Sequence, residues 1–215
     1  MNSYNIKLTL KLRTEKKLLV SSGMADLSPH ADICFMKTRY RGEVKLIIPG
    51  STFKGVLRTS LVRTAELLGY QGVEKSVYPS RVGGPEDLVC KIFGRPHGPA
   101  SKVSVKSIYL PNTVQRLTHV KIKDSCRVAE QGGIFTAEYL PIGMDFDVVI
   151  RGEELTMEEA EALFVALANL RWERIGRAGI IDIGIDVRKS EIPEMLVKGS
   201  EIINHVVEVM GRESL

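Results

Sequence analysis

The chain opens with alternating apolar and polar residues. From residue 4 to residue 13, even positions are apolar and odd positions are polar. A period of two residues places alternate side chains on opposite faces of a β-strand, so this segment is predicted to be a half-buried strand. Its polar face carries Lys7, Lys11 and Arg13, which we interpret as charges that keep an exposed sheet face soluble.

A helical period follows a turn at Pro49-Gly50. Ile47-Ile48 ends a short apolar strand, the turn redirects the chain, and Ser51 is placed to accept a hydrogen bond from the first free helix amides. The helix is predicted to run to about Gly69. At the helical repeat, its apolar side comprises Phe53, Val56, Leu57, Leu61, Thr64, Leu67 and Leu68.

The last third of the chain has the most regular pattern. Apolar and polar residues alternate over 145–151 and again over 181–187, which predicts two strands. Thr156 and Glu159 form a capping box at the start of a helix between them. Residues 194–211 are predicted to form a terminal helix. The apolar positions of the two strands and the capped helix are Phe146, Val148, Ile150, Ala160, Leu163, Phe164, Leu167, Leu170, Ile181, Ile183, Ile185 and Val187.

The middle of the chain is less periodic. Residues 21–45 are predicted to be an irregular loop, and a long irregular segment in a compact domain is usually either functional or disordered. Glycine and proline interrupt residues 72–100, so we expect loops there with one short helix. Residues 101–110 are predicted to be a strand, and residues 117–143 a hairpin.

In chain order these elements read strand, helix, strands, helix, strand. That order predicts an α+β fold with a ferredoxin-like (RRM-like) βαββαβ core in a single domain spanning residues 1–215. We expect the core to comprise about 1–70 and 144–190, with insertions at about 21–46 and 71–143 and a C-terminal helix at about 194–211.

Composition narrows the function classes without deciding between them. A net charge of +4 permits a nucleic-acid partner, whereas an aromatic content of 6% argues against extensive base stacking. The three cysteines, Cys34, Cys90 and Cys126, are scattered, which argues against a disulfide framework or a zinc knuckle and favours the cytoplasm. No apolar run approaches the roughly 20 residues of a membrane-spanning helix, so no membrane partner is expected.

A candidate anion site lies at the start of the helix that follows Pro49-Gly50. Ser51, Lys54 and Arg58 fall on one stripe within the first turns, where helix amides point outward and the helix dipole favours anions. A hydroxyl, an ammonium and a guanidinium at this place are suited to bind phosphate. The alternative is that Lys54 and Arg58 are solvated surface charges.

The stretch Ile48-Pro49-Gly50-Ser51-x-x-Lys54-Gly55-x-x-Arg58 resembles a segment of the RAMP superfamily, the repeat-associated RNA-binding proteins of CRISPR systems. The resemblance implies that Ser51, Lys54 and Arg58 contact the backbone of a guide RNA.

A second resemblance to this family covers residues 117–143. His119-x-x-Ile122, followed by Gly132-x-x-Phe135-x-x-Glu138-x-x-Pro141-x-Gly143, is similar to the family's "thumb" hairpin. The resemblance implies that this hairpin, with His119 and Lys121, reaches across a duplex of guide and target. Lys123-Asp124 departs from the family's Asp-Arg at this point.

The glycine-containing segment after Trp172 resembles the family's glycine-rich signature, here reduced to Gly176, Gly179 and Gly184. The resemblance implies RNA contacts from Arg174, Gly176, Arg177 and Gly179, with glycine amides close to the RNA because no side chain intervenes. Trp172 is predicted to be a packing residue rather than a base platform.

The irregular loop before Pro49 resembles the loop that carries an aspartate and a following basic residue in backbone subunits of type III effector complexes. Asp32 and Lys37 occupy those places. The resemblance implies that Asp32 is catalytic and binds a divalent cation, Mg²⁺, and that Lys37 contacts RNA. Asp26 is a second candidate carboxylate, and His30 is predicted to have no role.

Taken together, the resemblance implies a guide-RNA-binding backbone subunit of a type III CRISPR interference complex that cuts target RNA endonucleolytically. Its implied partners are guide RNA, complementary target RNA, other subunits and further copies of the chain stacked as a helical filament. Two alternatives stay open. One is a non-catalytic scaffold subunit, and the other is a ribonuclease that processes repeat RNA alone, against which the single-domain length and the thumb argue.

Overall fold

The computed structural model describes residues 2–21, 31–65, 69, 87–123, 125 and 127–212. Its main sheet has four antiparallel strands in the order β4-β8-β1-β9. The strands are β1 (Tyr4–Thr14), β4 (Val103–Val105), β8 (Asp145–Leu155) and β9 (Ile181–Ile185). The mixed architecture with antiparallel sheets confirms the predicted α+β class.

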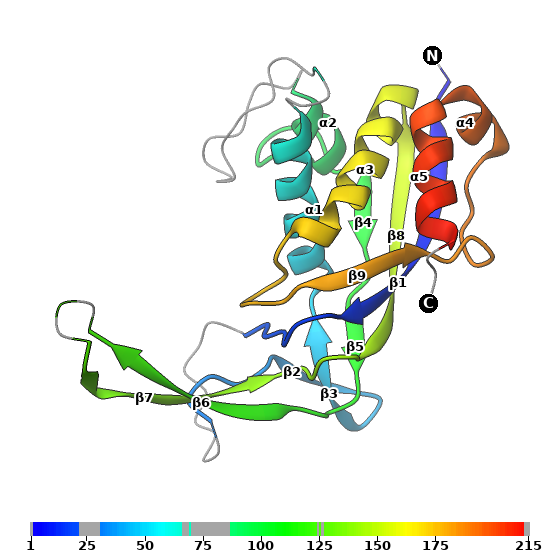
Figure 1. The fold of residues 1–215 in the computed structure, drawn as a ribbon. Helices are drawn as coiled ribbons and strands as arrows, with labels where there is room; N and C mark the ends of the chain where they lie inside the picture. The colour runs from blue at the N-terminus through cyan, green and yellow to red at the C-terminus, as the bar shows by residue number, and fades with distance from the viewer. Residues whose placement is uncertain are drawn as a thin grey trace.

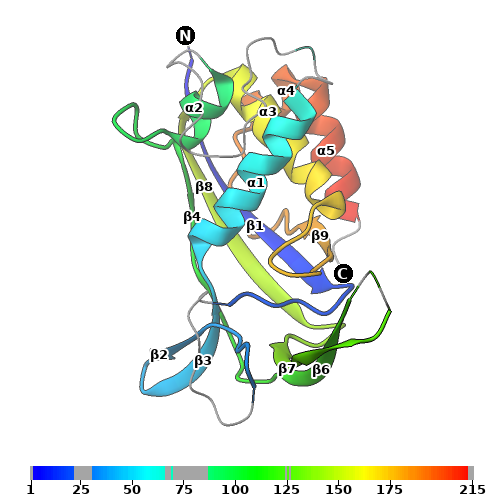
Figure 2. The ribbon, with the colours of Figure 1, turned by 90° about the vertical axis from the view of Figure 1, so that its left-hand side faces the viewer.

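Helices cover one face of this sheet, as Figures 1 and 2 show. The helices α1 (Gly50–Ala65), α3 (Met157–Asn169) and α5 (Glu201–Arg212) lie side by side, with α2 (Leu88–Phe93) beyond α1. The predicted capping box of Thr156 and Glu159 is present at the start of α3. Among the described residues, no helix is long and apolar enough to cross a membrane.

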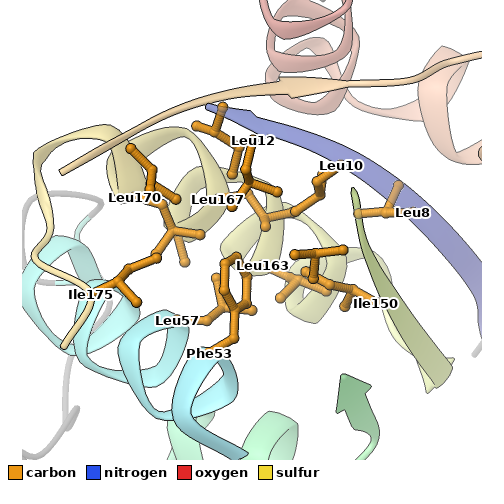
Figure 3. Packing of buried hydrophobic residues seen from close by; sticks show 14 of the residues in the cluster. Leu8, Leu10, Leu12, Phe53, Leu57, Ile150, Leu163, Leu167, Leu170 and Ile175 are labelled. Atoms are coloured by element: carbon orange, nitrogen blue, oxygen red, sulfur yellow. The ribbon is translucent and has the colours of Figure 1, made fainter. Parts of the chain in front are cut away.

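The alternating positions of β1 form the floor of the core. Leu8, Leu10 and Leu12 are at most 1% exposed, and they meet Leu57 of α1 and Leu163 of α3 in the cluster shown in Figure 3. The predicted apolar stripes of β1, α1 and α3 thus join in one core. Burying a side chain of this size contributes about 1.5–3 kcal/mol to stability.

The polar face of β1 is partly covered by the chain itself. Lys7 pairs with Glu191, and Lys11 lies 3.7 Å from Asp186. Both carboxylates belong to the segment after β9, which also buries Thr9. The prediction of a solvent-exposed sheet face is therefore wrong along this part of β1.

Two smaller sheets lie beyond the end of the main sheet where α1 begins (Figures 1 and 2). One has the order β2-β3-β5, with β2 at Lys37–Tyr40, β3 at Glu43–Ile48 and β5 at Ile108–Leu110. The other pairs β6 (Gln115–Ile122) with β7 (Ala129–Tyr139), which confirms the predicted hairpin. The irregular loop predicted over residues 21–45 is wrong where β2 and β3 form.

Three element boundaries also differ from the predictions. The single strand predicted over residues 101–110 is two strands, because β4 joins the main sheet and β5 a smaller one. The terminal helix is α4 (Glu194–Gly199) followed by α5, with Ser200 between them capping the amide of Ile203. Val187 is 50% exposed and follows the end of β9. The insertion predicted at 71–143 thus contains one strand of the main sheet.

The start of α1 is held against β4 by a close backbone approach. A Cβ at Gly50 would lie 2.0 Å from the carbonyl oxygen of Val105, which is too close without movement of the backbone. By contrast, a Cβ at Gly55, five residues further along α1, would meet nothing within 4 Å.

These two glycines give a matched test. Gly50→Ala should destabilise the fold by roughly 1–3 kcal/mol, because the helix start or β4 must shift. Gly55→Ala should stabilise it by about 0.5–1 kcal/mol, because alanine is the better helix former. Urea denaturation of both variants measures the difference, and equal midpoints would contradict the proposed close contact.

Candidate nucleic-acid interface

The first turn of α1 carries the candidate anion site. The helix begins at Gly50, before the predicted cap residue Ser51, and the amide of Gly50 donates to Oγ of Ser107 at 3.2 Å. Ser51 therefore lies in the first turn with an exposed side chain, and its predicted role as the helix cap is wrong. Its hydroxyl stays available to an external partner at the positive end of the helix dipole.

Ser51, Lys54 and Arg58 come together at one pocket of about 500 Å³. The opposite wall is the segment from Phe93 to Ser101. Lys54 donates to Oγ of Ser101 at 2.6 Å. Partial burial, together with the charge of Arg58, lowers the pKa of Lys54. A bound anion would offset both the burial of the Lys54 charge and its repulsion by Arg58, so this arrangement is suited to phosphate.

The opposite wall of the pocket contributes a cation that sequence reasoning did not select. Arg95 lines the pocket, and its side chain packs over Gly98, where a Cβ would lie 2.3 Å from Cγ of Arg95. The signal in the sequence was the run of glycine and proline that shapes this turn, with Gly94 at a φ of 74°. Among the described residues, no carboxylate forms an ion pair with Lys54 or Arg58.

A second pocket, of about 530 Å³, lies beside α1 where the 3-10 turn Leu170–Trp172 follows α3. Trp172 and Arg174 line it, and both are exposed. The indole of Trp172 is 82% exposed, so the prediction that it is a packing residue is wrong. Between them, the buried carboxylate of Glu173 pairs with Arg63 of α1.

The predicted glycine loop packs tightly on its own chain. A Cβ at Gly176 would lie 2.2 Å from the carbonyl oxygen of Leu19, and one at Gly179 would lie 2.2 Å from Cδ1 of Leu18. Arg177 is exposed, and its backbone exchanges hydrogen bonds with Leu19. The space beside both glycines is thus occupied by the protein, which gives them a packing role, while the side chain of Arg177 stays accessible.

Asp32 lies against the β6–β7 hairpin. Its side chain accepts a hydrogen bond from the amide of Thr136 at 2.7 Å, and its own amide donates to the Thr136 carbonyl at 2.9 Å. The carboxylate is exposed, so a second oxygen can reach solvent or a ligand. Within the described part of the chain, no group of three or more His, Cys, Asp or Glu side chains could hold a metal. Asp26 and His30 lie outside the described residues.

Lys37 is held by Glu138, a fully buried carboxylate on β7. Nζ of Lys37 lies 2.8 Å from Glu138, and Arg116 and the amide of Phe35 also donate to it, at 3.4 and 3.3 Å. Burial raises the pKa of Glu138, but these donors and the charge of Lys37 outweigh it, so the net pKa is lowered. Lys37 therefore anchors the 31–37 segment to the hairpin.

The hairpin residues predicted to bind RNA also have internal partners. His119 lies 3.0 Å from the hydroxyl of Tyr139 and stacks on Phe135 at 5.1 Å between ring centroids. Lys121 pairs with Glu130 at 2.7 Å. The other face of the hairpin exposes Val120, Ile122 and Ile134, the last at 67%.

Apart from the glycine loop, the predicted residues thus form two groups. Ser51, Lys54 and Arg58 lie on α1, with Arg174 on its neighbouring turn. Asp32, Lys37, His119 and Lys121 lie on or against the hairpin. Figure 2 places the hairpin beyond the end of the main sheet at which α1 starts.

Neutralising Glu138 should weaken the hairpin. Because the folded-state pKa of Glu138 lies below its ordinary value of 4.5, its contribution is present above pH 4.5 and is lost as pH falls through the lower folded value. We expect Glu138→Gln to cost about 1–3 kcal/mol at neutral pH and less in acid. Urea denaturation across this pH range measures the effect. The exposed Glu153→Gln is the control, and equal losses at every pH would contradict the role of the charge.

The family model of the RAMP superfamily matches residues 37–180. No curated protein sequence matches the chain. Solved structures are similar in fold, and two of them share 14% sequence identity with this chain. A chain of type III-B Cmr-beta in its apo state has a TM-score of 0.60, with 85% of this chain and 98% of that chain covered. A chain of Cmr-beta bound to cognate target RNA has a TM-score of 0.57, with coverage of 82% and 96%. The family match spans α1, the hairpin and the first two glycines of the glycine segment, Gly176 and Gly179, and the chain belongs to the RAMP superfamily.

Proposed function

We propose that this chain is a guide-RNA-binding backbone subunit of a type III CRISPR effector complex. The observation that carries the proposal is the pocket at the start of α1, where Ser51, Lys54 and Arg58 face Arg95. Three cations and a helix N-terminus at one pocket favour a polyanion, and phosphates of an RNA strand have that charge. The family match and the similarity to chains of Cmr-beta complexes support it.

We assign the main sheet to a ferredoxin-like core. In the order β1, α1, β4, β8, α3, β9, the elements read βαββαβ, and the two strands that precede the helices, β1 and β8, are central in the sheet. On this assignment β2, β3, β5 and the β6–β7 hairpin are additions at one end. These additions are suited to contact a second RNA strand, or a neighbouring copy of the chain in a stacked filament.

We further propose that Asp32 supports metal-dependent cutting of target RNA. A divalent cation, when bound, would stabilise the charge that develops on the phosphate during strand cleavage. The exposed carboxylate of Asp32 fits one position in such a cation's coordination sphere, and phosphates of the RNA would have to supply further oxygen ligands. The chain's own contribution is the anchoring of Asp32 to Thr136.

A non-catalytic scaffold subunit is the second candidate. The hydrogen bond from Thr136 gives the Asp32 carboxylate a structural role that needs no metal. A scaffold would bind the same RNA at α1 and leave cleavage to another subunit.

The RNA-binding proposal is tested on α1. We expect Lys54→Ala and Arg58→Ala each to weaken binding of single-stranded RNA by roughly tenfold, because each removes a charge-assisted phosphate contact. Each should also lower the salt dependence of binding by about 0.7 in the logarithmic slope. Lys198→Ala removes the same charge from an exposed ion pair on α4 and is the control. Unchanged affinity and slope in both α1 variants would refute the proposal.

The cleavage proposal is tested in the assembled complex with labelled complementary RNA and Mg²⁺. Asp32→Ala should reduce cutting by roughly a hundredfold or more, because a metal ligand is lost. Asp32→Asn keeps an acceptor for the Thr136 amide but removes the negative charge, so it should be similarly inactive. The exposed Asp145→Asn should cut normally. Full cutting by Asp32→Asn would favour the scaffold candidate.

A further inference from the structure

Trp172 is a large apolar side chain that the fold leaves uncovered. It is the one tryptophan in the chain, it is 82% exposed, and it stands on the turn that follows α3. Exposing an indole to water is unfavourable, and a planar aromatic surface beside cations suits a nucleotide, whose base has two apolar faces and whose phosphate is charged.

The pocket beside Trp172 has the charge of a nucleic-acid site. Thr52, Thr59 and Arg174 line it together with Trp172. Among the described residues that line this pocket and the Lys54 pocket, Glu173 is the one acidic side chain, and Arg63 forms an ion pair with it. Within the described ranges, Arg174 has no carboxylate in an ion pair with it, which leaves its charge for an external anion.

Gly55 joins this pocket to the Lys54 pocket. It lines both, it is exposed, and open space surrounds the position that a Cβ would take. Its backbone is ordinary helix, so nothing in the fold requires glycine there. The two pockets therefore adjoin at the exposed backbone of Gly55, with Lys54 and Arg58 in one and Trp172 and Arg174 in the other.

We propose that single-stranded RNA crosses α1 over Gly55, with phosphate at Lys54 and Arg58 and one nucleobase stacked on Trp172. Arg174 then faces the adjoining phosphate. This inference rests on the proposed function and adds a base-stacking platform to it. An aromatic platform of this kind tolerates any base, since every base presents a π-face.

Because Trp172 is the one tryptophan, its fluorescence reports directly on the site. Titrating the full chain with single-stranded RNA that lacks internal base pairs should quench this fluorescence in step with binding measured by polarisation. A ribose-phosphate oligomer of equal length without bases should bind through its charge but leave the fluorescence unchanged. Stacking of a base on the indole is the physical reason for the difference.

Variants separate stacking from folding. Trp172→Ala should weaken RNA binding by roughly 5- to 150-fold, the range for one stacked base, whereas Trp172→Phe should retain most of the affinity. Gly55→Ala should raise the melting temperature and yet weaken binding, because the added methyl group stands where the strand crosses. Melting curves of the Trp172 variants should match the wild type, since the side chain is exposed.

The outcomes distinguish this inference from the proposed function. If RNA binds in a Lys54- and Arg58-dependent manner but neither quenches Trp172 nor depends on it, the platform is refuted and the proposed function stands. If the wild-type chain binds no RNA, both are refuted. If the fluorescence changes with protein concentration alone and is insensitive to RNA, Trp172 contacts another copy of the chain and the inference is wrong.

Discussion

The packing of α1 on the main sheet is the constraint on which the candidate interface depends. Phe53 and Leu57 are buried against residues of β1, β8 and α3 (Figure 3), and their burial sets the orientation of the helix. Lys54 and Arg58 each follow one of these residues, about 100° further round the helix, so they lie beside the buried side and line the pocket. The contact of Gly50 with the Val105 carbonyl then determines where along the sheet the helix begins. Together these contacts hold the cations opposite Arg95.

A buried charge organises the other half of the candidate site. Glu138 accepts hydrogen bonds from Lys37, Arg116 and the amide of Phe35, and therefore links the segment before β2 to both strands of the hairpin. Asp32 is joined to the same hairpin through Thr136. A fully buried carboxylate is costly unless its partners are complete, so the segment and the hairpin should keep their relative positions as a unit. Asp32 should therefore keep its position relative to the hairpin when the hairpin binds a partner.

Predictability followed the strength of the periodic pattern. The strand at 4–13, the helix after Gly50, the capping box at Thr156 and the hairpin were predicted correctly, because their apolar periods or turn residues act over a few neighbouring positions. The strand β2 was missed, and of β3 only the end at Ile47-Ile48 was predicted, because β2 and the first half of β3 bury few side chains, which leaves little alternation to detect. Ser51 was assigned the cap because serine is a common cap residue, yet Ser107, distant in sequence, accepts the first helix amide.

The sequence by itself determined the order of the strands and helices that have a clear period, the α+β class and the short register of Ser51, Lys54 and Arg58, because local hydrogen bonding and side-chain period decide these features. Tertiary structure alone decided that Arg95 completes the pocket, that Gly176 and Gly179 pack on Leu18 and Leu19, and that Trp172 is uncovered. Each of these depends on contacts between segments far apart in the chain. A residue's type and near neighbours do not specify which distant segment will cover it. The packing of the whole fold specifies that segment.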